Sequence, residues 1–378
     1  MFIFTEDAIF FFYKFTLKTL YLHHIVSKQA QHENLAMEIG NPEHRRTARD
    51  AFERIVKRAR FGPKDDEVVG KDVELMRSLL MNEMFLKHPD RVRAVCLSPD
   101  GTKIFSGCDD ARVRVWDAAT GECVMTLHGH TYEVHALAVF PDGVTILSAS
   151  HDYTIRMWKT DSGACVQTMT NHQGFANAIV ILPDGKKFAT GDTDHKVRIW
   201  DVASGECKKT LEGHSGEVTS LAVAPNGKFI ASGGYDNTTR IWNISSGECT
   251  RTLGGHKSAV RGVAVLSDSQ TVVSVGSDDK VRVWDTQTGT FKIKFKITEI
   301  SYFSTVSVAS DGKRVMCSNN NEITVWDMEA GTLQMTLRAH AKAINSIAIS
   351  QDGKVIVSAS DDFSVCVYDG ITGKIKKI

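Results

Sequence analysis

The sequence predicts an all-β fold in which four-stranded sheets repeat around a closed ring. Six tryptophans are spaced 42 residues apart, from Trp116 to Trp326, and Tyr368 falls in the same register. Tight-turn tripeptides such as Pro99-Asp100-Gly101 precede them, since proline presets φ and glycine tolerates positive φ. Self-similarity at a period of about 40–45 residues is typical of short strands stacked around an axis, because one unit alone cannot bury its faces.

Residues 1–61 are expected to form a mainly helical N-terminal extension. Phenylalanine crowds the first 21 residues, but four charged residues interrupt the run, whereas a membrane-spanning helix needs about 20 mostly uncharged residues. The run is therefore expected to dock on the rest of the protein or on a partner, and a start at Met37 is the alternative. Asn41 and Pro42 then predict the beginning of a basic amphipathic helix. Residues 62–80 are interpreted as a linker, because they begin with Gly-Pro and are rich in charge.

The ring is expected to span residues 81–378. Within each period a run such as "VHALAVF" is apolar on both faces, which suits an inner strand between neighbouring sheets. Runs such as "VRVW" and "IRMW" alternate as strands do, and turns such as Thr120-Gly121 follow them. Met81–Phe85 and the C-terminal "GKIKKI" both hold the register of an outer strand. The sequence does not choose which of these two segments closes the ring.

The stretch "LEGHSGEVTSLAVAPNGKFIASGGYDNTTRIWN" resembles a WD repeat, opening with Gly213-His214 and closing with Trp242-Asn243. The resemblance extends over about residues 85–378 and implies a seven-bladed β-propeller. The sixth repeat departs from the pattern, because it lacks the Gly-His opening and is one residue shorter before Trp326. Its loops are therefore expected to be specialised.

Serine or threonine, histidine and aspartate recur before five of the six tryptophans and before Tyr368. In the WD-repeat family such residues form a buried hydrogen-bonded chain within a blade, and the resemblance implies the same structural network here. An enzyme needs one triad at one reacting centre, so six copies argue against catalysis. The expected network residues are His88, Ser106, Asp110, Trp116, His130, Ser148, Asp152, Trp158, His172, Thr190, Asp194, Trp200, His214, Ser232, Asp236, Trp242, His256, Ser274, Asp278, Trp284, His340, Ser358 and Asp362.

Residues that vary within a fixed exposed register are candidates for recognition. The resemblance places three such registers on the central upper surface of the propeller. Their mixture of aromatic, arginine, acidic and small polar side chains suits a protein or peptide interface. The candidate partner-binding residues are Arg91, Arg93, Glu133, His135, His151, Phe175, Asn177, Glu217, Tyr235, Arg261, Tyr302 and Asp361.

Charge and cysteine usage narrow the classes of ligand. Basic and acidic side chains number 45 each, so no global field favours nucleic acid or an anionic membrane. Arginines stand two residues before five of the tryptophans and share one strand register. We interpret them as residues that pack along the blades. The eight cysteines contain no CxxC pair, and neither a metal nor a cofactor is expected.

We therefore expect a non-catalytic scaffold or adaptor that assembles a multiprotein complex on the propeller surface. The alternatives are a substrate-recruiting subunit of a ubiquitin ligase and a G-protein-beta-like signalling subunit. The partners expected are other proteins or peptides, with no nucleic acid and no transmembrane segment. The propeller is expected to be a monomer within a larger complex, in the cytoplasm, with the nucleus as the alternative.

Overall fold

The computed structural model describes residues 85–170, 172–294 and 303–376. The predicted extension (1–61), the predicted linker (62–80) and residues 81–84 lie outside the described residues. The described strands belong to one compact unit that begins at Phe85. Within the described residues, no helix is long and apolar enough to cross a membrane.

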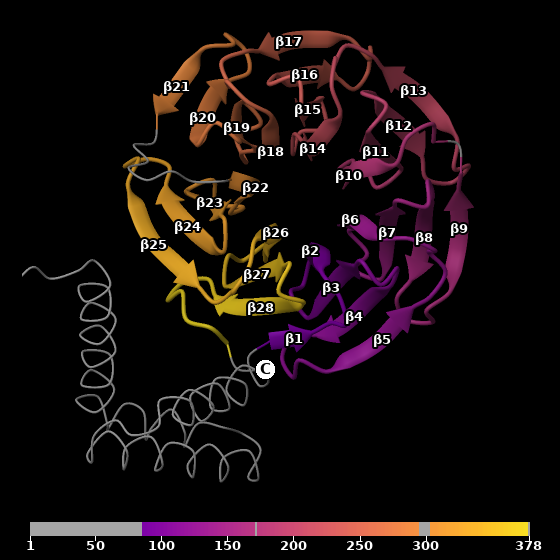
Figure 1. Ribbon diagram of the computed structural model, residues 1–378. Coiled ribbons are helices and arrows are strands. Elements are labelled where there is room, and N and C mark those ends of the chain that lie inside the picture. The colour runs from indigo at the N-terminus through magenta and orange to yellow at the C-terminus, as the bar shows by residue number, and fades with distance from the viewer. Residues whose placement is uncertain (1–84, 171, 295–302, 377–378) are drawn as a thin grey trace, which may run out of the picture. The chain divides into compact units, whose positions relative to one another are not determined.

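Seven four-stranded antiparallel sheets stand around a central axis, which confirms the predicted seven-bladed β-propeller (Figure 1). In the first six blades the strands follow the chain from the axis to the rim. Blade 1 comprises β2 (Val92–Leu97), β3 (Lys103–Cys108), β4 (Val113–Asp117) and β5 (Cys123–Leu127); blade 2 comprises β6 (Val134–Val139), β7 (Thr145–Ser150), β8 (Ile155–Lys159) and β9 (Cys165–Met169); blade 3 comprises β10 (Ala176–Ile181), β11 (Lys187–Asp192), β12 (Val197–Asp201) and β13 (Cys207–Leu211).

The remaining blades repeat this order until the ring closes. Blade 4 comprises β14 (Val218–Val223), β15 (Phe229–Gly234), β16 (Thr239–Asn243) and β17 (Cys249–Leu253); blade 5 comprises β18 (Val260–Val265), β19 (Thr271–Gly276), β20 (Lys280–Asp285) and β21 (Phe291–Lys294); blade 6 comprises β22 (Phe303–Val308), β23 (Arg314–Asn319), β24 (Glu322–Asp327) and β25 (Leu333–Arg338); blade 7 comprises β26 (Ile344–Ile349), β27 (Val355–Ser360), β28 (Ser364–Asp369) and β1 (Phe85–Lys87).

Two segments share the outer edge of blade 7. Strand β1 pairs with the first half of β28, where Leu86 lies opposite Val365. Ile375 forms a β-bridge with Tyr368 near the end of β28, and the next residue donates its backbone N–H to Val367 O at 2.8 Å. Of the expected strand Met81–Phe85 only Phe85 is described, and the paired strand runs from there to Lys87. The outer edge is thus a composite of β1 and part of the C-terminal segment, and the pairing of β1 with β28 closes the ring and covers the strand edge.

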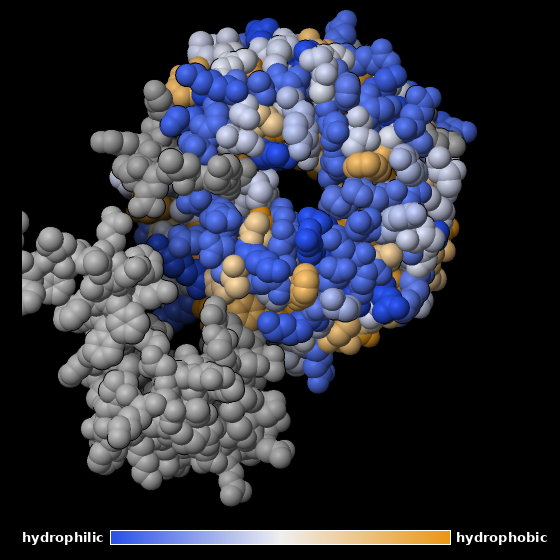
Figure 2. Space-filling view, in the orientation of Figure 1, coloured by the Kyte–Doolittle hydropathy of each residue, from blue (hydrophilic) through white to orange (hydrophobic). Residues whose placement is uncertain are grey.

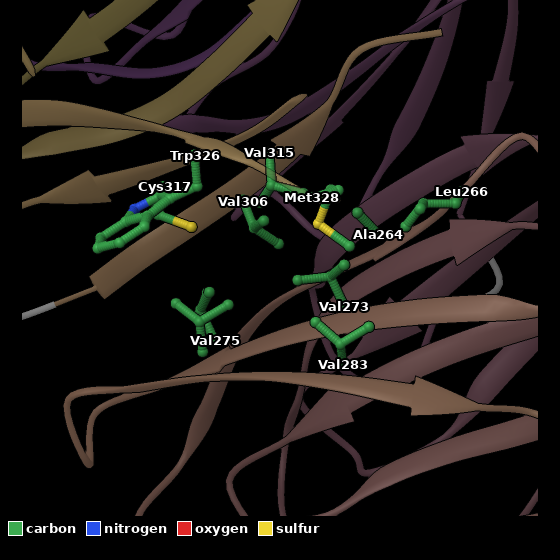
Figure 3. Close-up of a cluster of buried hydrophobic side chains, with 11 residues drawn as sticks. Ala264, Leu266, Val273, Val275, Val283, Val306, Val315, Cys317, Trp326 and Met328 are labelled. Atoms are coloured by element: carbon green, nitrogen blue, oxygen red, sulfur yellow. The ribbon is translucent and has the colours of Figure 1, made fainter. Parts of the chain in front are cut away.

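The core lies between neighbouring sheets, as expected when strands are apolar on both faces. Blades 5 and 6 meet through a buried cluster that includes Val273, Val275, Val315, Cys317 and Trp326 (Figure 3). The sixth blade keeps this core although its repeat lacks the Gly-His opening. Burial of side chains of this size contributes about 1.5–3 kcal/mol each relative to exposure.

Every inner strand carries a β-bulge near its beginning. In β2, Val92 pairs with Cys108 and Ala94 with Gly107, so Arg93 is an extra residue in the ladder. A bulge of this kind re-aims a side chain and increases the local twist. The corresponding extra residues in blades 2, 3, 4, 5 and 7 are His135, Asn177, Thr219, Arg261 and Asn345. We call the end of the ring at which the inner strands begin the upper face.

Figure 2 shows one face of the ring as a surface. The ring is hollowed at its axis, and the coloured residues are mainly hydrophilic with hydrophobic ones scattered among them. No large continuous apolar patch, the usual mark of hydrophobic docking, stands out among the coloured residues of this face.

Candidate functional site

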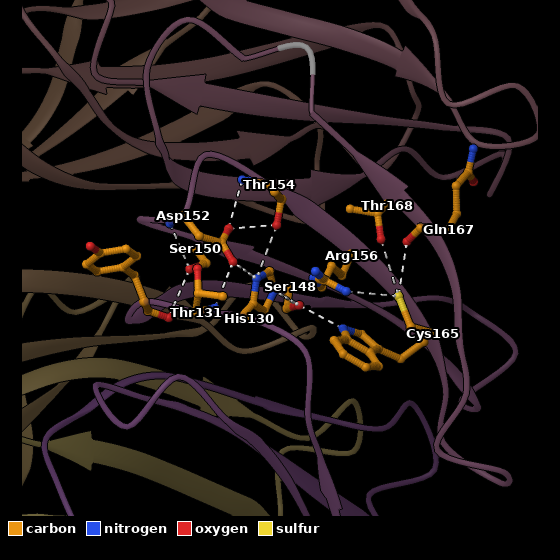
Figure 4. Close-up of polar contacts among 12 residues, drawn as sticks. His130, Thr131, Ser148, Ser150, Asp152, Thr154, Arg156, Cys165, Gln167 and Thr168 are labelled. Atoms are coloured by element: carbon orange, nitrogen blue, oxygen red, sulfur yellow. Dashed lines mark hydrogen bonds and ion pairs between the residues drawn. The ribbon is translucent and has the colours of Figure 1, made fainter.

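Blade 2 contains a hydrogen-bonded chain that runs from its surface to its core (Figure 4). His130 Nδ1 lies 2.8 Å from Asp152 Oδ2, and His130 Nε2 lies 2.7 Å from Ser148 Oγ. Trp158 Nε1 donates to the same Ser148 oxygen at 2.8 Å. Burial raises the pKa of Asp152, but hydrogen bonds from His130 and Thr154 outweigh it and hold that pKa well below its usual range. The chain satisfies polar groups that would otherwise be buried without partners.

Three other blades contain the same chain. In blade 7 Tyr368 replaces tryptophan, and its hydroxyl accepts from Ser358 at 3.4 Å. Burial raises the pKa of Asp362 in this blade, but its bonds with His340 and Ser364 lower it to about 2. The equivalent residues are His214, Asp236, Ser232 and Trp242 in blade 4, His256, Asp278, Ser274 and Trp284 in blade 5, and His340, Asp362 and Ser358 in blade 7.

Blade 1 differs from the expected network at its aspartate. His88 Nε2 lies 2.7 Å from Ser106 Oγ, and Trp116 Nε1 donates to the same oxygen at 2.8 Å. Asp110, however, forms an ion pair with Arg114, and His88 Nδ1 instead lies 3.1 Å from the backbone oxygen of Leu86. The expectation that Asp110 bonds to His88 is therefore wrong. Burial and the positive charge of Arg114 lower the pKa of His88 to about 4.

Blade 3 exchanges one aspartate for another. His172 Nδ1 lies 3.2 Å from Asp192 Oδ2, while Asp194 forms an ion pair with Arg198. Trp200 Nε1 donates to Thr190 Oγ1 at 3.0 Å. The expectation that Asp194 bonds to His172 is wrong, because the buried carboxylate of Asp192 already occupies that position. The equivalent slot in other blades holds an uncharged residue such as Ser150 or Gly234, and this difference was a readable signal.

The irregular sixth blade has a smaller polar cluster. Ser318 Oγ accepts from the backbone N–H of Thr305 at 3.0 Å and lies 2.7 Å from Ser304 Oγ. Ser318 is fully buried, so these bonds satisfy a hydroxyl that water does not reach.

Four of the residues at the bulges tie one blade to the next. The Asn177 amide donates to Val218 O at 3.1 Å, and the Asn345 amide donates to Val92 O at 3.0 Å. The hydroxyls of Thr219 and Ser304 donate to backbone oxygens of the next inner strand in the same way. We call these four side chains the blade latches. Asn177, expected among the partner-binding residues, therefore has its amide engaged within the ring.

At the other bulges the side chain contacts neighbours on the upper face. Arg93 makes two hydrogen bonds to Asp109, at 2.7 and 2.8 Å, and lies 3.5 Å from Asp361. The hydrogen bond to Asp109 is the main cause that raises the pKa of Arg93, and the charges of Asp361 and Glu133 add to it. Four of the expected partner-binding residues, Arg93, Glu133, His135 and Asp361, therefore lie in blades 1, 2 and 7, which are neighbours.

His135 and His151 stack on each other beside Phe175. The two imidazole centroids are 3.8 Å apart with an interplanar angle of 13°, and the centroids of His151 and Phe175 are 3.9 Å apart. His151 belongs to this stack, whereas Ser148 and Asp152 bond to His130. Within the sequence "SASHD", Ser148 and Asp152 therefore belong to one site and His151 to another.

A second pair lies on blades 4 and 5. The guanidinium of Arg261 stands 4.7 Å from the ring centroid of Tyr235, and Arg261 Nη1 donates to the Tyr235 hydroxyl at 2.6 Å. Arg261 Nε donates to Ser277 Oγ at 3.0 Å. A cation over an aromatic face adds about 0.5–1 kcal/mol at an exposed site. This pair holds two predicted anchors in one orientation.

The other expected residues are less connected. Arg91 is exposed and Glu217 is half-buried, and the backbone oxygen of each accepts from a turn of its own blade. Tyr302 lies outside the described residues. Sequence reasoning missed Tyr153, whose ring centroid is 6.1 Å from that of Phe175. No group of three or more potential metal ligands occurs in the described part of the chain.

Comparison with known proteins identifies the family to which the repeats belong. The model of the family described as "WD domain, G-beta repeat" matches residues 82–117, 121–159, 163–201, 205–243, 247–285 and 331–369, together more than half of the chain. The matched ranges skip residues 286–330, where the irregular sixth repeat lies.

Two curated proteins are similar to this chain over a short segment. Ribosome biogenesis protein BOP1 homolog of Drosophila grimshawi is 48% identical over 40 residues, which is 11% of this chain and 5% of that protein. The Drosophila melanogaster protein of the same name is 45% identical over 40 residues, with the same coverage. The match thus spans a small fraction of these relatives. Together the family match and the seven blades establish that the chain belongs to the WD-repeat family.

Proposed function

We propose that this chain is a non-catalytic scaffold that holds protein or peptide partners on the upper face of its propeller. The observation that carries the proposal is that two sets of polar residues have different surroundings, one inside the blades and one on the upper face. The serines, histidines and aspartates that recur in the blades are engaged in internal hydrogen bonds, as in blade 2. The residues that vary between repeats, such as His151 and Tyr235, stand on the upper face.

The chemistry of these variable residues supports an interface with proteins. Aromatic and arginine side chains carry most of the binding energy in protein complexes, and Phe175, Tyr235 and Arg261 are of these types. Tyr235 and Arg261 are oriented by each other, which lowers the entropy lost when they bind a partner.

The likeness to ribosome biogenesis proteins supports nothing more specific than this. It covers 40 residues, which is close to the 42-residue period of the ring, and 5% of each relative. We therefore propose no particular complex or pathway. Recruitment of substrates to a ubiquitin ligase, G-protein-beta-like signalling and a cytoplasmic location stay predictions.

A crosslinking pull-down from cell extract tests the scaffold proposal. The full chain is compared with a triple variant, Phe175→Ala, Tyr235→Ala and Arg261→Ala, and with a matched rim variant, Val124→Ala, Val166→Ala and Leu333→Ala. The rim residues are exposed on the outer strands β5, β9 and β25. We expect the upper-face variant to lose partners that the rim variant keeps. Equal recovery by all three proteins would overturn the proposal.

A further inference from the structure

Four rings form a contiguous group on the upper face of blades 2 and 3. His135 and His151 are stacked, Phe175 lies against His151, and the Tyr153 ring stands edge-on to Phe175 at 71°. His135 and Phe175 are 6.4 Å apart between centroids. We call His135, His151, Tyr153 and Phe175 the ring cluster.

Burial disfavours the protonated, charged form of both imidazoles in the ring cluster. Burial is the main cause that lowers the pKa of His135 to about 4, and the neighbouring His151 and Arg93 lower it further. Burial also lowers the pKa of His151, with Arg93 acting in the same direction and Glu133 opposing it. Loss of charge from these imidazoles reduces the repulsion that a cation would meet beside the rings of Phe175 and Tyr153.

Acidic groups outnumber basic groups beside the ring cluster. Glu133 Oε2 lies 3.6 Å from His151 Nδ1. Asp109, Asp361 and Glu133 all act on the single guanidinium of Arg93. Of the charged side chains that act on the two imidazoles themselves, Asp109 and Glu133 are acidic and Arg93 is basic. The local field thus favours a positively charged ligand over a negatively charged one.

Tyr153 contributes an exposed ring to this cluster. Its side chain is 52% exposed, so its burial contributes little to stability. Its backbone has a φ of 64°, and the equivalent turn residues of other blades share this left-handed conformation: Ala111, His195, Asn237, Asp279 and Phe363. The conformation therefore belongs to the turn of the repeat. The exposed ring beside Phe175 lies where a partner can contact it.

We propose that the ring cluster, together with Glu133, is the docking site for a cationic side chain, arginine or lysine, of a protein partner. This inference rests on the scaffold function proposed above and names the chemistry of the partner. A guanidinium or ammonium group is attracted to the electron-rich face of an aromatic ring and forms a charge-assisted hydrogen bond with a carboxylate. The same upper face already contains one such contact, between Arg261 and Tyr235.

An acidic partner segment fits this part of the surface less well. Arg93, the nearest guanidinium to the ring cluster in this network, is engaged by Asp109 through two hydrogen bonds and by Asp361 at 3.5 Å. An incoming carboxylate has to displace one of these groups and leave it without its partner, which costs binding free energy.

Histidine-detected NMR on the full chain tests the inference. The probe is the blocked tripeptide acetyl-Gly-Arg-Gly-amide, compared with the same peptide carrying Gln or Glu in place of Arg, and the chain is labelled at histidine Cε1. We expect the Arg peptide to shift the signals of His135 and His151 in a saturable way, and added salt to weaken this binding. The Gln and Glu peptides are expected to leave both signals in place.

Three variants locate the binding. Glu133→Gln removes the carboxylate, and Phe175→Leu removes the ring while retaining an apolar side chain; each is expected to weaken the Arg peptide about threefold to tenfold. Glu217→Gln removes the same charge from the same register two blades away and is expected to change nothing. Equal weakening by Glu217→Gln, equal shifts with the Glu peptide, or no shift of either histidine would overturn the inference. If partners are still lost from the triple variant in the pull-down, only this inference fails and the scaffold function stands.

Discussion

The adjacent residues His151 and Asp152 are predicted to differ sharply in their contribution to stability. Asp152→Ala removes the acceptor for His130 Nδ1, for the backbone N–H of Thr131 and for both donors of Thr154. The His130 side chain is 1% exposed, and without the carboxylate its Nδ1 keeps only the hydroxyl of Thr154, 3.2 Å away, as a partner, at a cost of about 1–3 kcal/mol. The turn residues recover part of their bonds from water, which adds about 1 kcal/mol. The expected loss in free energy of unfolding is about 3 kcal/mol.

His151→Ala is the matched comparison. It removes one ring from the stack on the upper face, where aromatic contacts contribute about 0.5–1.5 kcal/mol, and leaves the chain of His130, Ser148 and Trp158 intact. Urea unfolding followed by tryptophan fluorescence measures both variants against the parent protein. If His151→Ala lowered the unfolding midpoint more than Asp152→Ala did, the assignment of the two residues to different sites would be refuted.

Three further outcomes follow from the ring. Leu86→Ala is expected to lower the free energy of unfolding in urea by about 2–4 kcal/mol, because Leu86 is 3% exposed in the closing strand β1. Val124→Ala, at a position that is 54% exposed, is expected to change it by less than about 0.5 kcal/mol. Equal effects of the two substitutions would argue against closure by β1. The folded-state pKa of Asp362, about 2, lies below its unfolded value of about 3.9. The unfolded state therefore binds more protons between these values, and the stability of the fold decreases as the pH drops from about 4 to 2. Asp362→Asn should flatten this part of the curve of stability against pH, and an unchanged curve would contradict the assignment. Asn177→Ala should cost about 1 kcal/mol, because the Val218 carbonyl loses its donor, and a neutral result would show that the blade latch contributes nothing.

The regular part of the fold could be predicted from the sequence because the repeat constrains it many times over. A period of 42 residues, a tryptophan in each unit and a turn before it determine where each sheet begins and ends. The four complete hydrogen-bonded chains follow the same spacing, with Tyr368 in the tryptophan position of blade 7.

The two departures from the network depend on which side chains compete for one partner in space. Asp110 pairs with Arg114 in blade 1, whereas in blade 5 Asp278 contacts both Arg282 and His256, so the spacing alone does not predict the loss. In blade 3 Asp192 takes His172 from Asp194, and this second departure did have a signal in the sequence, an aspartate in a slot that holds an uncharged residue in other blades. The composite edge of blade 7 was also hidden, because β1 and the segment that follows β28 come together only once the ring has closed.

The candidate site was predicted by register but not by contact. The registers identified His135, His151 and Phe175, yet nothing in their spacing revealed that the three rings stack. The bulge in each inner strand turns its extra residue toward either a neighbouring blade or the upper face. The choice depends on the side chain, since Asn177 reaches a backbone oxygen and His135 stacks on another ring.

The position of lysine crosslinks between this chain and its partners tests the central claim most directly. Lys257 and Lys342 are exposed in loops of the upper face, whereas Lys208 lies on the outer strand β13 and Lys354 in the turn between β26 and β27 at the opposite end. If partners are held on the upper face, crosslinks should gather at Lys257 and Lys342. Crosslinks concentrated at Lys208 and Lys354 would contradict the account.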